Sequence, residues 1–192
     1  MKLEGIKIGI AITGSFCSFE KAYKGMESLV KEGADIYPMM SAIAYKTDTK
    51  FGLSKEWNEK FEKLTGKEIL NTIEGVEPIG PTGYLDIIVV APCTGNTIAK
   101  MANGITDTSV TMACKAHLRN EKPVVVAMST NDGLGATAKN LATLLNKKNV
   151  YFVPFKQDDP AKKPNSLACD FELIKDTVIM ALEGKQIQPV IL

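Results

Sequence analysis

The chain has 192 residues, of which 45% are hydrophobic, and its formal net charge is +1. This length suits one globular domain with at most a modest lid, and the apolar content is sufficient to fill a core. The near balance of charge argues against nucleic acid or an anionic membrane surface as the partner.

Cysteine and histidine are sparse in this sequence. Cys17, Cys93, Cys114 and Cys169 form no CxxC pair, and His117 is the only histidine. This pattern argues against a disulfide framework and a Cys/His metal site, and it fits a reducing compartment. No signal-peptide pattern precedes the first strand-like run, and no apolar run approaches the roughly 18 residues of a membrane span. We therefore expect a cytoplasmic protein without a metal site.

The first predicted elements are a strand, a helix and a second strand. Residues 6–12 are apolar and β-branched and end at a Thr-Gly-Ser turn, which predicts a buried strand. Apolar residues recur at helical spacing over 18–32, and Gly33 follows as a stop signal. Residues 34–40 predict the next strand.

Residues 47–83 differ from the rest of the chain, because they are rich in charge and contain no long apolar run. A helix is expected over 54–64 and a Gly/Pro-rich loop over 75–83. Such a segment beside a regular sheet predicts a lid over a ligand or an oligomer contact. The aromatic side chains that would cover a flavin or meet a partner are Phe51, Trp57 and Phe61.

Strands and helices alternate regularly after this segment. Strands are predicted at residues 86–91, 123–128 and 150–155. Helices are predicted at residues 94–102, 109–118, 135–147 and 170–183. The alternation indicates right-handed βαβ units. We therefore expect a single α/β domain over 1–192, with a doubly wound, mostly parallel sheet in three α/β/α layers.

Polar turns follow four of the predicted strands. In open parallel sheets, ligands bind outside the carboxyl ends of the strands, near the point where the strand order reverses. Glycine permits close approach of the backbone, and hydroxyls and helix N-terminal amides bind phosphate oxygens. The candidate cofactor-binding residues in these turns are Thr13, Gly14, Ser15, Ser41, Pro92, Cys93, Thr94, Gly95, Asn96, Thr97, Ser129, Thr130 and Asn131.

These turns favour a mononucleotide as the ligand. The first turn is not GxGxxG and lacks the GK[ST] of a P-loop, which argues against a dinucleotide or a nucleoside triphosphate. Each turn taken alone is also explained by N-capping and turn formation. Their joint position at one edge of the sheet is what predicts a ligand site.

Two of the turns resemble the signature loops of a known family. Residues 11–15 (AITGS) and 91–100 (APCTGNTIAK) resemble those of the flavoprotein family of cysteine decarboxylases, which includes phosphopantothenoylcysteine decarboxylase and the flavin prenyltransferases. The resemblance implies a flavodoxin-like fold, FMN at subunit contacts, and a homo-oligomer built of trimers. The family's second loop usually reads Pro-Ala-Ser-Ala-Asn-Thr, so Cys93 and Gly95 replace small residues and keep room for a flavin ring.

Longer runs resemble a narrower branch of the same family. Residues 128–135 and 154–167 carry this resemblance, with support from 79–81 and 183–190, so that it covers nearly the whole chain. The branch implies one component of a two-component oxidoreductase of spore-forming bacteria, which removes two hydrogens from a cyclic dicarboxylate and makes it aromatic. The resemblance also implies a second, different component, expected to carry the nicotinamide cofactor NAD(P) and to be needed for activity. The location implied is the mother-cell cytoplasm.

Several departures from the decarboxylases bear on the activity. Residues 79–85 lack the family's histidine, residues 127–131 replace its Pro-Ala-Met-Asn run, and Cys169 lacks the glycines that follow the substrate-clamp cysteine. The missing residues are those that the acid–base chemistry of a decarboxylase would use. A stand-alone FMN-dependent decarboxylase or prenyltransferase is therefore kept as an alternative. A non-catalytic scaffold for the second component is the other.

No side chain is assigned a catalytic role from the sequence. His117 is expected to be a surface or capping histidine near a helix end, and Arg119 a solvated residue of the last turn, with a substrate carboxylate as its alternative partner. Cys93 is expected to pack as a small hydrophobe, with contact to a flavin ring as the alternative. The lysine-rich loop over 156–163 is either simply solvated or attracts a dianion.

Overall fold

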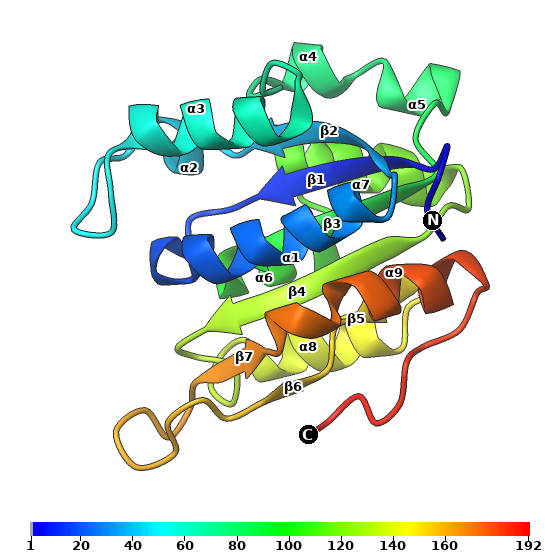
Figure 1. Ribbon diagram of the computed structural model, residues 1–192. Coiled ribbons are helices and arrows are strands. Elements are labelled where there is room, and N and C mark those ends of the chain that lie inside the picture. The colour runs from blue at the N-terminus through cyan, green and yellow to red at the C-terminus, as the bar shows by residue number, and fades with distance from the viewer. Residues whose placement is uncertain (1) are drawn as a thin grey trace.

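The computed structural model describes residues 2–192, and its centre is a sheet of five parallel strands (Figure 1). These strands are β1 (Lys7–Ile12), β2 (Asp35–Met40), β3 (Ile87–Cys93), β4 (Val124–Thr130) and β5 (Val150–Phe152). Their order is β2-β1-β3-β4-β5, which is the flavodoxin-like order with its switch point between β1 and β3. Two short strands, β6 (Phe155–Lys156) and β7 (Leu167–Cys169), extend the sheet: β7 pairs antiparallel with the end of β4, and β6 pairs antiparallel with β7.

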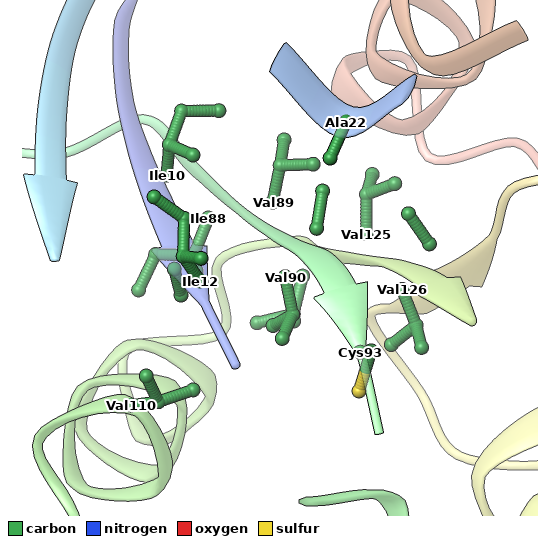
Figure 2. Packing of buried hydrophobic residues seen from close by; sticks show 14 of the residues in the cluster. Ile10, Ile12, Ala22, Ile88, Val89, Val90, Cys93, Val110, Val125 and Val126 are labelled. Carbon is green, nitrogen blue, oxygen red and sulfur yellow. The ribbon is translucent and has the colours of Figure 1, made fainter. Parts of the chain in front are cut away.

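Helices cover both faces of this sheet. One face carries the 3₁₀ turn η1 (Phe16–Ser18), helix α1 (Phe19–Lys31), the turn η2 (Phe171–Leu173) and helix α9 (Ile174–Leu182). The other face carries helices α6 (Gly95–Ala102), α7 (Ser109–Arg119) and α8 (Ala138–Leu145). Figure 2 shows Ala22 of α1 and Val110 of α7 on opposite sides of the central strands. Strands buried on both faces explain the unbroken apolar runs. The predicted three-layer, mostly parallel α/β fold is confirmed.

The segment 42–83 wraps around the β2 edge of the sheet. Its helices are α2 (Ala42–Lys46), α3 (Ser54–Thr65), α4 (Ile73–Val76) and α5 (Ile79–Thr82). Helix α3 packs against α1, whereas α4 and α5 pack against α7, as Figure 1 shows beside β2. Leu70 also bonds to the backbone of β2 at Pro38 and Met40. The segment therefore covers an edge strand that would otherwise present unpaired backbone groups.

The expected loop over 75–83 was wrong, because the chain forms the two short helices α4 and α5 there. The Thr72 hydroxyl caps α4 by accepting from the amide of Gly75 at 3.1 Å. Val76 and Ile79 are fully buried. Packing of these two side chains against the body outweighs the local preference of a Gly/Pro-rich stretch for a loop.

The aromatic residues of α3 belong to the core of the chain. Trp57 and Phe61 are buried, and their ring centroids lie 5.4 and 6.2 Å from that of Phe19 on α1. The expectation that they cover a flavin is not met, because their rings are used in this internal contact. Phe51 is 45% exposed, in the loop between α2 and α3.

Two further boundaries differ from the prediction. The strand expected over 150–155 divides after Phe152, where Pro154 has no amide hydrogen to donate, and the chain turns into β6. The helix expected over 135–147 begins only at Ala138, because residues 131–137 form turns closed by the Thr137 amide on the Asp132 carbonyl. Within residues 2–192, none of the helices combines the length and apolarity that crossing a bilayer requires.

Candidate functional site

The ends of β1 and β3 are joined directly at the switch point. The amide and hydroxyl of Thr13 donate to the Pro92 carbonyl at 3.2 and 2.8 Å, and the same hydroxyl accepts from the Thr94 amide at 3.0 Å. A register shift in β3 between Val90 and Cys93 lies beside these contacts. Such an irregularity re-aims the chain near a functional site. The structure thus brings the first and third predicted turns together.

A serine cluster ties the fourth predicted turn to the first. The Ser15 hydroxyl donates to the Ser129 hydroxyl at 3.0 Å, and the hydroxyls of Ser18 and Ser129 are 2.8 Å apart. Ser129 lies near the end of β4 and is mostly buried. The β1 turn, the start of the α1 segment and the end of β4 therefore form one connected hydroxyl network.

Several backbone amides at this edge have no protein partner. Within residues 2–192, the amides of Gly14, Phe16 and Cys17 make no hydrogen bond, and neither do those of Gly95 and Asn96 at the start of α6. Amides at helix starts are the groups that bind phosphate oxygens, with help from the helix dipole. These two clusters of donors, joined through Thr13, suit an anionic group placed between them.

Gly95 is required by close contact with two threonines. A Cβ atom on Gly95 would lie 2.6 Å from Thr130 Oγ1 and 2.7 Å from Thr137 Oγ1. The α6 start is also held by the Thr94 hydroxyl, which accepts from the Thr97 amide at 3.2 Å. This packing fixes the direction in which the first amides of α6 point.

Replacing Gly95 with alanine is expected to lower the free energy of unfolding by about 1–3 kcal/mol, because the added methyl group overpacks this contact. Gly14→Ala is the matched control, since its Cβ would meet Ile43 at 3.3 Å, a distance that a small shift relieves. Urea unfolding of both variants checks the prediction. Equal stability losses in the two variants would contradict it.

Three other predicted site residues lie at the same edge. One caps a helix, one is exposed and one is buried in the core. The Ser41 amide donates to the Ile12 carbonyl, and the Ser41 hydroxyl caps α2 by accepting from the Ala44 amide at 3.3 Å. Asn131 is exposed. Cys93 is fully buried among apolar side chains, as Figure 2 shows, and burial raises the pKa of its thiol well above the ordinary value.

Sequence reasoning missed two side chains at this edge. Ser18 completes the serine cluster, and Thr137 packs against Gly95. Ser18 stands at the start of the α1 helix, three residues after Ser15, and that position was the available signal. Thr137 carried no such signal, because only the fold places the turn after β4 beside α6.

His117 is fully buried, so the expectation of a surface or capping histidine was wrong. Neither ring nitrogen makes a hydrogen bond within residues 2–192. Burial, aided by the charge of Lys122, lowers the pKa of His117 to about 4, although the backbone of Pro123 and Asp86 and the Asp86 charge oppose this. A neutral imidazole enclosed in this way cannot take a proton from a substrate at the edge.

The lysine-rich loop lies beside a cavity on the α1 face, which has a volume of about 600 Å³. Lys163 pairs with Asp158 at 3.6 Å, Lys162 is exposed, and Lys156 faces the cavity. The cavity carries three lysines and three carboxylates, so its charge is mixed. It lies between α1 and the β6–β7 hairpin, and its lining includes none of the predicted phosphate-binding residues. In the part of the chain that is described, no three His, Cys, Asp or Glu side chains gather as metal ligands.

The fold defines a flavodoxin-like α/β protein, and the polar turns at its switch point are its candidate ligand site. A model of the family described as Flavoprotein matches residues 1–182, and the chain belongs to that family. The chain is 46% identical over 98% of its length to the B subunit of dipicolinate synthase from Bacillus subtilis (strain 168), of which it covers 94%.

Two further comparisons agree with this family membership. The crystal structure of the dipicolinate synthase B subunit from Bacillus halodurans C matches with a TM-score of 0.92 and 45% identity, covering 100% of this chain and 98% of the other. The coenzyme A biosynthesis bifunctional protein CoaBC of Thermococcus kodakarensis is 30% identical over 97% of this chain, which spans 46% of that longer protein.

Proposed function

We propose that this chain acts as the B subunit of a dipicolinate synthase, which converts dihydrodipicolinate to dipicolinate during sporulation together with an A subunit. The observation that carries this proposal is the 46% identity that extends over 98% of the chain. The same proposal places the protein in the cytoplasm of the mother cell. The stand-alone decarboxylase or prenyltransferase gains no support, because residues 79–85 form α5 and the turn after it without any histidine.

FMN is the cofactor we propose for this edge, and the residues present fit its phosphate. The unpartnered amides of Gly14, Phe16 and Cys17 are phosphate donors, with Thr13 holding their turn against β3. The residues that we propose for the whole cofactor site are the predicted set together with Ser18. When bound, the flavin supplies a hydride acceptor.

The reaction removes one hydride and one proton from the ring, and two carboxylates must be held by cations or amides. The chain's residues at the edge bind and orient through hydroxyls and amides, and His117 is enclosed away from them. We therefore propose that the base comes from the A subunit, whose nicotinamide cofactor, NAD(P), is the second candidate acceptor of the hydride.

We also propose that the chain forms a homo-oligomer, a trimer or a multiple of trimers. Three large apolar side chains of the 42–53 segment are exposed: Ile43 is 65% exposed, Leu53 50% and Phe51 45%. Figure 1 shows the loop between α2 and α3 projecting from the body. Exposed apolar side chains in a projecting segment are typical of contacts between protomers.

The isolated chain is expected not to convert dihydrodipicolinate, even with FMN added, because its one histidine is buried away from the edge. Adding the A subunit and a nicotinamide cofactor should restore turnover, measured as dipicolinate absorbance in the ultraviolet. Full turnover by the chain alone would contradict the proposal that the A subunit supplies the base. If Ser15→Asp in the complex leaves turnover unchanged, the chain is a scaffold for the A subunit instead.

A further inference from the structure

A second cavity lies on the helical face formed by α6, α7 and the end of α8, with a volume of about 280 Å³. Its lining runs along α7 from Thr111 to Arg119, which corresponds to about 12 Å of helix. We call it the α7 groove. None of the residues predicted for the cofactor lines it. We propose that the α7 groove binds a small organic dianion with an apolar body.

The floor of the α7 groove is apolar. Met101 and Cys114 are buried beneath it, and Leu118 and Ile105 line its sides. Burial raises the pKa of the Cys114 thiol to about 12, so the sulfur stays uncharged and behaves as a small hydrophobe. An apolar floor with a few polar groups around it is the usual composition of a small-molecule site.

Three cations surround this floor. Lys115 and Arg119 are four residues apart on α7 and share one helix face, and Lys147 follows the end of α8. All three are exposed, and no carboxylate lines the groove. Every ion pair found within residues 2–192 uses other cations. Three positive charges that form no ion pair within residues 2–192 are thus concentrated here, in a chain whose net charge is +1.

The positions of the three cations indicate what kind of ligand the groove binds. Lys115 offers a point charge to one carboxylate or phosphate, and the Arg119 guanidinium, which lies against Gly80 of α5, adds positive charge at the end of the groove. Lys147 supplies a separate positive charge from another element, which suits a second anionic group. The larger cavity beside α1 differs in this respect, since three carboxylates accompany its three lysines. The proposal does not rest on the reaction proposed for the cofactor edge.

Calorimetric titration with benzene-1,3-dicarboxylate tests the proposal on the full chain. We expect Lys115→Gln/Arg119→Gln to bind this probe at least about tenfold more weakly than the unmodified protein, because two of the three cations that line the groove are lost. Lys147→Gln, which leaves α7 intact, should weaken binding severalfold. Lys139→Gln, an exposed lysine on α8 outside the groove, is the control and should not change the affinity.

The neutral benzene-1,3-dicarboxamide should not bind measurably. Added salt should weaken binding of the dianion, because it screens the attraction to the cations. Unchanged affinity in both the α7 double variant and Lys147→Gln would overturn the proposal. Equal binding of the diamide would do the same, because it would show that the cations play no part. If the groove proves to be covered by a second copy of the chain in solution, the site is an interface and the proposal fails.

Discussion

FMN is expected to bind at least about a hundredfold more weakly after the substitution Ser15→Asp. Ser15 lies between the unpartnered amides of Gly14 and Phe16, where we propose that the phosphate binds. Two like charges about 4 Å apart near a protein surface repel by roughly 4 kcal/mol, and a hundredfold loss corresponds to about 2.7 kcal/mol. The variant also loses the hydroxyl bond to Ser129.

Quenching of flavin fluorescence measures this loss. The unmodified chain should prefer FMN to riboflavin strongly, and Ser15→Asp should abolish that preference, which identifies the phosphate as the group affected. Thr143→Asp places the same charge on an exposed position of α8 and should leave FMN binding unchanged. Ser15→Ala should lower the FMN affinity only a few-fold, because the backbone amides remain. Unaltered FMN affinity in Ser15→Asp would contradict the assignment of the phosphate to this turn.

Acid is expected to destabilise the protein through His117 before the carboxylates protonate. The pKa of His117 is about 4 in the folded state, compared with about 6.5 for an exposed histidine. Between these values the unfolded chain binds a proton that the folded chain does not. The stability is therefore full above about pH 6.5 and declines as the pH falls toward 4, by about 2–3 kcal/mol at about pH 4.5.

His117→Leu should remove this part of the pH dependence. Within residues 2–192 the ring nitrogens make no hydrogen bond of good geometry, although the backbone of Pro123 and Asp86 lies close enough to favour the charged ring, so leucine removes at most a weak contact. Urea unfolding between about pH 7.5 and 4.5 should show a flatter profile for the variant than for the unmodified protein. Lys122 and Asp86 face the ring with opposite effects, and Lys122→Gln is the control that should raise the pKa of His117 modestly. Parallel profiles for His117→Leu and the unmodified chain would show that His117 is not the titrating group.

The sequence by itself determined the parallel strands and the turns that follow them. Apolar β-branched runs such as 87–90 and glycine or hydroxyl turns such as 13–15 are local patterns, and their meaning does not depend on distant residues. The flavodoxin-like class followed from the alternation of strands and helices together with the family resemblance. The cofactor-site residues remain a prediction, although the structure brings their turns to one edge.

Only the tertiary structure decided contacts between residues far apart in the chain. Ser15 meets Ser129 across 114 positions, and His117 is enclosed by backbone from before β3 and before β4. Packing on α7 makes α4 and α5 helical despite their composition. Trp57 lies in a polar segment, and its burial results from the packing of α3 against α1. Burial and long-range pairing depend on which elements become neighbours, and local propensity carries no information about that choice.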